Sequence, residues 1–340
     1  KKNRFKKEKL FFSGRQALFS ILNHVKKNKR IEKVFIPSYL PEGVIEPIKK
    51  SKIDYVFYKL DVKLNPNIDF LENKLKKKNL LFIFIHYFGF YYKNYKLNKL
   101  LNKKNITVLH DLAQAPFLKI SDIKINKDDY FLYSFNKSFP ITDGSFVKTN
   151  KKLNIKKIKI DKKLSYALNF YDSHLHLGKK IFDLKNYKNF TKIINKHTYF
   201  YDKYYSIIKS NFLNYQISNT SFNLLNQINF KKFKNQRMKN SRYIYKNIKN
   251  PNVKFLHNKL NKFSQPWCIP LLVKKRDKIL NTLKRKNILA GKITHRWNFI
   301  PNNRNYKNEK NFFKNHILIP NNEFLKKKEI SNLIERVNKI

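Results

Sequence analysis

The stretches VLHDLAQA (residues 108–115) and YSFNKSFPITDG (residues 133–144) decide how this chain is interpreted. Each ends an apolar, strand-like run and then changes abruptly to polar residues. The first offers the carboxylate of Asp111 and the second the amine of Lys137. A pyridine cofactor such as pyridoxal phosphate needs this pair, because a lysine forms the Schiff base and an acid keeps the ring nitrogen protonated. We therefore expect these stretches to form two halves of one cofactor site.

Strand-like and helix-like segments alternate around these two stretches. Apolar strands are predicted at 34–36, 55–58, 81–85, 106–109, 131–135 and 145–148, and helices at 14–26, 43–50, 68–75 (capped by Asn67) and near 95–102. Such alternation predicts an α/β fold with a largely parallel sheet covered by helices on both faces. His86, Asp111 and Lys137 all come at or just after strand ends, so we expect them to meet in one crevice.

The rest of the chain predicts a second, smaller domain. Residues 151–215 suggest helices and loops without a motif. A polar helix from about 226, a strand at 269–273, a helix at 276–286 and a last helix from 327 suggest a small α/β domain. We predict a large domain over 1–225 and a small C-terminal domain over 226–340. The longest apolar run, 80–92, is too short to span a bilayer, so no membrane insertion is expected.

The net charge of +53 is not taken as a sign of nucleic-acid binding. Of the 75 basic residues 65 are Lys, and Gly and Ala are scarce, as in proteins from AT-rich genomes. A nucleic-acid reader more often favours Arg, whose planar fork grips phosphates and guanine edges. We expect most of these lysines to be solvated and no nucleic-acid partner.

Other chemistries find little support in the sequence. The single cysteine, Cys268, excludes an internal disulfide and a multi-cysteine metal site, and it is compatible with a cytoplasmic location. The pair His174 and His176 lacks matching ligands other than Asp172, so no metal site is expected. No P-loop, dinucleotide fingerprint or serine nucleophile elbow is present.

Each candidate residue also has a purely structural interpretation. Lys137 lies in a stretch poor in other charges, where partial desolvation favours the neutral amine that a Schiff base requires. Asp111 could instead cap a helix, and Gln114 could be an ordinary helix residue or a hydrogen-bond partner of the ring's 3-oxygen. Gly14 opens the first helix, either as part of a phosphate seat or of a simple cap. Ser134 could donate to the same phosphate or be only a strand-end hydroxyl.

From about residue 11 onward, the chain resembles the DegT/DnrJ-type sugar aminotransferases, which are pyridoxal phosphate enzymes of fold type I. DLAQA at 111–115 is the most specific match. The other matching segments are FSGRQAL (12–18), VFIPSY (34–39), LNP (64–66), HYFG (86–89), SFNK (134–137) with DG at 143–144, RD (276–277) and LIP (318–320).

The resemblance implies a role for each matching residue. Lys137 would form the Schiff base, Asp111 would hold the ring nitrogen and Gln114 would lie beside it. The phosphate contacts would come from Gly14, Arg15 and Ser134.

The chain also departs from the family in three places. Pro41 stands where many members place a stacking aromatic, so Tyr39 or His86 would cover the ring instead. Ser134 lies three residues before the lysine rather than five. The loop that usually reaches the phosphate from a neighbouring subunit is not found, and residues 219–221 are the candidate for its place.

The function implied by the resemblance is transfer of an amino group, from glutamate, to a nucleotide-linked keto-sugar. The enzyme would be a cytoplasmic homodimer acting in amino-sugar or polysaccharide biosynthesis. One alternative is a different pyridoxal phosphate reaction, dehydration, although some family dehydratases carry His where this chain has Lys137. Two further alternatives are a catalytically degenerate relative and a basic nucleic-acid-binding protein.

Overall fold

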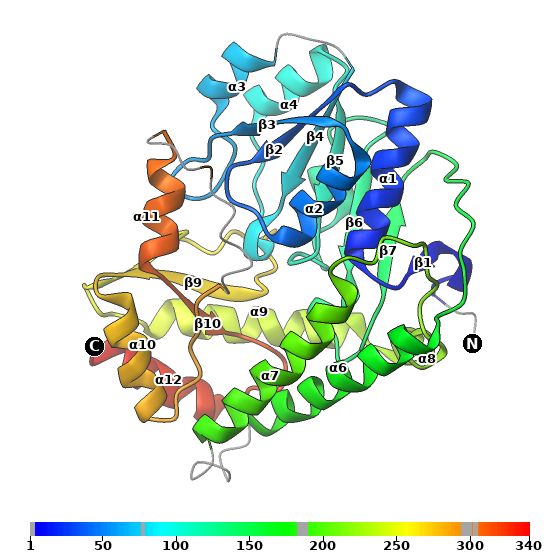
Figure 1. The fold of residues 1–340 in the computed structure, drawn as a ribbon. Coiled ribbons are helices and arrows are strands. Elements are labelled where there is room, and N and C mark those ends of the chain that lie inside the picture. Colours follow the sequence, from blue (N-terminus) through cyan, green and yellow to red (C-terminus); the bar gives the residue numbers. More distant parts are fainter. Residues whose placement is uncertain (1–3, 76–78, 182–189, 294–300, 302–304) are drawn as a thin grey trace.

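The computed structural model describes residues 4–75, 79–181, 190–293, 301 and 305–340. Its main sheet has the strand order β1-β7-β6-β5-β4-β2-β3 (Figure 1). The bounds of these strands are β1 (Leu10–Phe11), β2 (Lys33–Pro37), β3 (Asp54–Tyr58), β4 (Leu80–Ile85), β5 (Thr107–Asp111), β6 (Tyr130–Ser134) and β7 (Ser145–Lys148). Strands β2 to β6 pair in parallel, while β7 and β1 are antiparallel to their neighbours. The predicted α/β class with a largely parallel sheet is confirmed.

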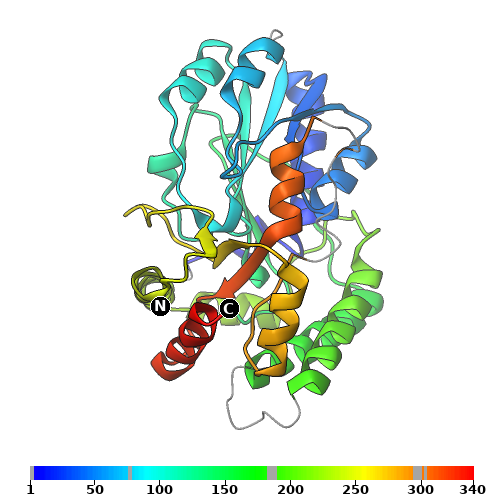
Figure 2. The ribbon, with the colours of Figure 1, turned by 90° about the vertical axis from the view of Figure 1, so that its left-hand side faces the viewer.

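Helices cover both faces of this sheet. Figure 2 shows α1 (Gly14–Lys29) and α2 (Glu42–Ser51) on one side, and α3 (Ile68–Lys74) and α4 (Tyr95–Lys103) on the other. Helix α1 buries its apolar stripe, as the spacing of Ala17, Ile21 and Val25 predicts. Asn67 caps α3 by accepting from the Phe70 N–H, also as predicted. The apolar faces of these helices and of the strands form one continuous core.

Strands β4, β5 and β6 lie side by side and end together. Ile85 pairs with Asp111, and Asp111 with Leu132. The residues that follow these strands therefore share one edge of the sheet, where ligands of parallel sheets bind. Two short 3-10 turns start there, η2 (Tyr87–Gly89) after β4 and η3 (Phe135–Lys137) after β6.

Residues 151–215, which offered no motif, contain a helical hairpin. Helices α6 (Lys162–Ile181) and α7 (Phe190–Ile208) pack along each other (Figure 1). Aromatic side chains dominate its buried interface with the sheet domain, including Phe12, Tyr171 and Tyr204. The remaining short elements before the C-terminal part are η1 (Lys7–Lys9), α5 (Ile120–Ile123) and α8 (Asn219–Gln227).

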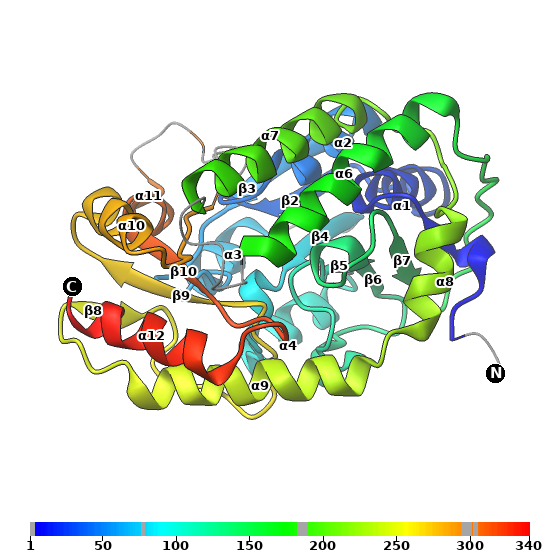
Figure 3. The ribbon, with the colours of Figure 1, turned by 90° about the horizontal axis from the view of Figure 1, so that it is seen from below.

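The C-terminal part builds a second, antiparallel sheet of order β10-β9-β8. Its elements are α9 (Phe230–Asn247), β8 (Val253–Phe255), β9 (Cys268–Val273), α10 (Arg276–Arg285), α11 (Lys307–Asn315), β10 (His316–Pro320) and α12 (Lys327–Asn338). Figure 3 shows α9 and α12 lying alongside each other below this sheet. The predicted domain boundary at 225/226 falls inside α8 and stays a prediction. None of the helices in the described ranges is long and apolar enough to cross a bilayer.

Candidate active site

Lys137 and Asp111 are presented by neighbouring strands. Asp111 is the last residue of β5, and Lys137 ends the 3-10 turn that follows β6. Asp111 is buried, and its Oδ1 accepts from the Ala113 N–H at 2.9 Å. No helix begins there, so the helix-cap interpretation of Asp111 and the helical interpretation of Gln114 are wrong. The local hydrogen bond closes a tight turn instead, because a short carboxylate can reach the N–H two residues on.

The environment moves the pKa values of these two groups toward each other. Crowding by protein lowers the pKa of the Lys137 amine, against the attraction of Asp111 and with a further lowering by Arg15. Burial raises the pKa of the Asp111 carboxyl, against the Lys137 charge and the Ala113 N–H. Lys137 nevertheless remains accessible to solvent. The site therefore holds a reachable amine that is neutral more often than an ordinary lysine.

Gly14 and Ser134 come together beside this pair. A β-carbon on Gly14 would stand 3.3 Å from the Ser134 Oγ, so a side chain at position 14 would crowd the hydroxyl. Ser13 caps α1 by accepting from the Gln16 N–H at 3.3 Å, and Ser134 donates to the Asn136 Oδ1 at 3.1 Å. A helix N-terminus next to a hydroxyl is a suitable seat for a phosphate. The two predicted phosphate contacts are thus neighbours.

The Arg15 side chain is already engaged. Its guanidinium binds Glu46 and the Lys209 carbonyl, and it donates to the Tyr205 hydroxyl at 2.7 Å. These partners lie on α2, on α7 and just after α7. A phosphate contact of Arg15 stays a prediction, and it would use the backbone N–H in the first turn of α1.

His86 is held by a chain of buried polar groups. Its Nε2 lies 3.0 Å from the His110 Nδ1, and the His110 Nε2 lies 3.3 Å from the Asp129 Oδ2. Burial, together with His110, lowers the pKa of His86 well below its usual value, so the ring is neutral. The His86 ring also stacks on Phe84, and its backbone N–H donates to the Asp111 carbonyl at 3.1 Å. His86 thus adjoins Asp111.

Tyr39, the other ring proposed to cover the cofactor, lies in an aromatic cluster. It is fully buried, stacks on Tyr87 at 6.0 Å and meets the edge of Phe312 at 5.5 Å. Pro41 stands directly before α2 as its N-cap residue. The structure connects His86 directly to Asp111, whereas it places Tyr39 among other rings.

Gln114 fastens the turn that follows His86. Its Oε1 accepts from the Phe88 N–H at 3.0 Å. The next residue, Gly89, has a φ of +78°, and a β-carbon there would stand 2.2 Å from the Gln265 carbonyl oxygen. Only glycine fits this close approach. The HYFG segment is therefore a contact point between the large sheet and the C-terminal part.

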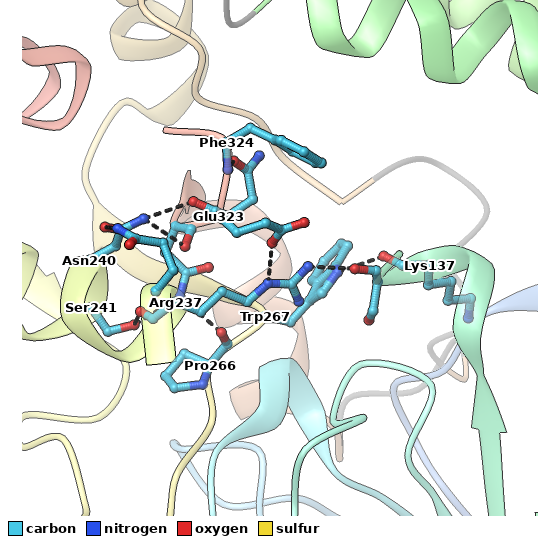
Figure 4. A network of polar contacts seen from close by, with 12 residues as sticks. Lys137, Arg237, Asn240, Ser241, Pro266, Trp267, Glu323 and Phe324 are labelled. Carbon is cyan, nitrogen blue, oxygen red and sulfur yellow. Dashed lines mark hydrogen bonds and ion pairs between the residues drawn. The ribbon is translucent and has the colours of Figure 1, made fainter. Parts of the chain in front are cut away.

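Two residues of the C-terminal part reach the lysine turn and were not foreseen. The Trp267 indole Nε1 donates to the Lys137 carbonyl at 2.8 Å, and the Arg237 Nη2 donates to the Ser138 carbonyl at 2.6 Å (Figure 4). No motif or spacing in the sequence indicates either contact. The only available signal is that Trp267 is one of two tryptophans in the chain.

The candidate segment for the neighbour loop packs within its own chain. Asp143 accepts from the N–H and hydroxyl of Ser218, at 2.7 and 2.6 Å. Ser221 accepts from the Thr142 and Asp143 N–H groups at 3.2 and 3.3 Å. Residues 219–221 form the first turn of α8 and support the segment after the lysine. Any phosphate contact from them to a second subunit stays a prediction.

Among the described residues, no group of three or more His, Cys, Asp or Glu side chains is arranged to hold a metal ion. His174 instead stacks on His197, with ring centroids 3.7 Å apart.

Known proteins resemble this chain in structure rather than in sequence. No family model matches it, and no curated protein matches it. Helicobacter pylori PseC, an aminotransferase involved in pseudoaminic acid biosynthesis, superposes with a TM-score of 0.68 at 16% identity, over 97% of this chain and 85% of that one. A DegT/DnrJ/EryC1/StrS aminotransferase from Brucella abortus gives 0.63 at 15% identity, over 97% and 84%.

A related enzyme of different chemistry also superposes. The E. coli GDP-4-keto-6-deoxy-D-mannose-3-dehydratase with bound hydrated pyridoxal phosphate gives a TM-score of 0.66 at 16% identity, over 96% of this chain and 86% of that one. These likenesses cover nearly the whole chain. The chain therefore has the fold of the DegT/DnrJ-type sugar aminotransferases and their dehydratase relative, the fold that its sequence predicts.

Proposed function

We propose that this protein is a pyridoxal phosphate-dependent aminotransferase that moves an amino group from glutamate to a nucleotide-linked keto-sugar. One observation carries the proposal. The Lys137 amine and the Asp111 carboxylate lie at adjacent strand ends of this fold, and crowding by protein shifts the pKa of each against the attraction of the other. Perturbed pairs of this kind are typical of catalytic sites.

The residues around the pair fit the proposed cofactor. The cradle between Gly14 and Ser134 would take the phosphate at the start of α1. Asp111 keeps its Oδ2 free of hydrogen-bond partners within the described residues, so this oxygen would hold the protonated ring nitrogen. Once bound, the cofactor would supply an electron-withdrawing ring that stabilises negative charge on the substrate carbon.

Lys137 then has two tasks. Its Nζ would hold the cofactor covalently, and the amine of the donor would take its place when the donor binds. The Lys137 amine, whose pKa crowding by protein lowers, would then accept a proton from the α-carbon of the donor. Asp111 would pair with the protonated ring nitrogen, and His86, neutral and hydrogen-bonded to His110, lies next to Asp111 without adding charge.

Dehydration of a nucleotide sugar is the second candidate, favoured by the likeness to the E. coli dehydratase. Lys137 argues for amino transfer, because the resemblance places His there in some dehydratases. A homodimer, a cytoplasmic location and a role in amino-sugar or polysaccharide biosynthesis belong to the same proposal. The pseudoaminic acid enzyme among the similar structures supports the amino-sugar role.

The first test is the visible absorption spectrum of the purified protein. We expect the purified full chain to bind pyridoxal phosphate with a visible absorption band that glutamate bleaches, with release of 2-oxoglutarate. Lys137→Ala should lose the band, whereas Lys148→Ala, which changes an exposed lysine on β7, should keep it. Protein that forms no band with the cofactor would refute the proposal. Formation of a deoxy keto-sugar in place of an amino-sugar product would favour dehydration.

A further inference from the structure

The turn that carries Lys137 is held from outside the large sheet. Within the turn, the N–H groups of Ser138 and Phe139 both donate to the Phe135 carbonyl, at 2.9 Å each. The carbonyls of Lys137 and Ser138 accept instead from Trp267 and Arg237. Figure 4 shows the Lys137 side chain leading away from this contact. The C-terminal part therefore grips the backbone of the lysine and leaves its amine free.

Trp267 joins two turns of the site. Its backbone N–H donates to the Phe88 carbonyl at 2.7 Å, while its indole N–H donates to the Lys137 carbonyl at 2.8 Å. Two residues earlier, the Gln265 N–H donates to the Gly89 carbonyl at 2.8 Å. The segment thus ties the turn after β4 to the turn after β6.

Arg237 is fixed by a buried ion pair. Its Nε lies 2.8 Å from the Glu323 Oε2, and both side chains are at least 92% buried. Its second hydrogen bond is donated by Nη2 to the Ser138 carbonyl. A hydrogen bond from a charged donor is stronger than a neutral one, and two bonds from one planar guanidinium leave little freedom. Arg237 therefore places the Ser138 carbonyl firmly.

The three segments that carry Trp267, Arg237 and Glu323 are also bound to one another. Asn321 donates to the Pro266 carbonyl and to the Ser241 hydroxyl, both at 2.8 Å, and Asn240 donates to the Asn322 carbonyl at 2.7 Å (Figure 4). Helix α9, the segment before β9 and the segment after β10 thus form one rigid support.

A buried ion pair is weak evidence for stability, because desolvation of two charges offsets most of their attraction. Its position is more informative than its energy. The arginine of the pair donates to the carbonyl of Ser138, the residue next to Lys137, and the Trp267 indole donates to the carbonyl of Lys137 itself.

We propose that Trp267 and Arg237 are positioning residues, which hold the carbonyls of Lys137 and Ser138 and thereby fix where the Lys137 amine stands beside Asp111. We call these two residues the clamp. Its role in catalysis rests on the proposed function, whereas its role in placing the amine is independent of that function. Without the clamp, the turn would relax and the amine would move toward bulk solvent.

The test measures the pKa of the Lys137 amine in the full chain without added cofactor. An amine-reactive succinimidyl ester is applied over a range of pH, and labelling of the peptide containing Lys137 is quantified by mass spectrometry. In Trp267→Phe and in Arg237→Met we expect the labelling midpoint to rise by about one pH unit, a tenfold loss of free amine at a given pH. Tyr245→Phe is the matched control, because it removes a hydroxyl that donates to the His257 carbonyl at 2.9 Å in the same part of the chain.

Each outcome decides the proposal. An unchanged midpoint in folded Trp267→Phe and Arg237→Met overturns it, as does an equal shift in Tyr245→Phe. If both variants fail to fold, Glu323→Gln, which keeps the size of the side chain and removes its charge, decides with a smaller shift in the same direction. A shift in protein that forms no cofactor band refutes only the proposed function. A band that glutamate bleaches, with an unchanged midpoint in the variants, refutes only the clamp.

Discussion

The carboxyl end of the large sheet and the C-terminal part of the chain contribute different things to one site. The sheet edge supplies the reactive groups, Asp111 and Lys137, on adjacent strands. The C-terminal part supplies hydrogen bonds to backbone carbonyls, from Trp267 and Arg237. If this division holds, changes at the sheet edge should remove the chemistry outright, and changes elsewhere should alter placement or stability.

The largest effect is expected at Lys137. Lys137→Ala removes both the covalent holder of the cofactor and the proton acceptor, so we expect kcat/KM for amino transfer to fall by about four orders of magnitude. Steady-state assay of 2-oxoglutarate release measures it, with Lys148→Ala as the control. Activity within tenfold of wild type would show that the sheet edge does not hold the reactive amine.

Asp111→Asn should give the next largest effect. The amide keeps an oxygen for the Ala113 N–H but loses the charge opposite the ring nitrogen, so we expect a decrease in kcat of about 10²–10³-fold. The sign of its second effect separates it from the clamp. The Asp111 charge raises the pKa of Lys137, so its loss lowers that pKa, and labelling of Lys137 should move to lower pH. Movement to higher pH would contradict the pairing of the two groups.

The sequence predicts the reactive residues at the carboxyl end of the sheet, because the pattern that marks them lies within a few neighbouring residues. Asp111 and Lys137 each follow an apolar run directly, so strand pattern and strand ends can be recognised within a few residues. Trp267 and Arg237 reach their carbonyls across separations of 130 and 99 residues, and a carbonyl carries no side-chain identity to detect. Contacts of this kind require the folded chain.

The same contrast applies to the elements themselves. The main strands and helices were predicted because their periodicity is strong. Strands β1, β8 and β10 and helix α11 were not predicted; β1 and β8, with two and three residues, are too short for a pattern. The α6–α7 hairpin showed only weak periodicity, because its buried side consists of aromatic residues spread among lysines.

Asp129 is a second buried carboxylate close to the site, and it tests whether such a group has a structural rather than a catalytic role. Its Oδ2 accepts from the Ile125 and Asn126 N–H groups, at 2.7 and 2.8 Å, and faces His110. Asp129→Ala leaves these buried donors unsatisfied, so we expect the free energy of unfolding to fall by about 3 kcal/mol in chemical denaturation. Asp129→Asn, which keeps one oxygen there, should fall by less. Equal losses in both variants would show that the charge, rather than the acceptor, is what matters.

The smallest effect is expected on the lysine-rich surface of the C-terminal part. A groove of about 900 Å³ between β8, β9, α10 and α12 is lined by Lys274, Lys275 and Lys278, among other basic residues. These side chains are exposed, and at physiological ionic strength solvent and salt screen their charges beyond about 8 Å. Changing all three to Gln removes three charges, yet we expect kcat/KM for the nucleotide sugar to stay within about twofold at this salt concentration.

The triple variant tests whether exposed lysines differ in function from Lys137. The reactive lysine differs from the 64 others in its environment rather than in its chemistry, since crowding by protein, the Asp111 carboxylate and the Arg15 charge set its pKa. A large decrease in kcat/KM in the triple variant, with KM raised and kcat unchanged, would mean that the basic surface recruits the anionic substrate. The C-terminal part would then take part in substrate binding as well as in placing the amine, and the division between the two regions would have to be abandoned.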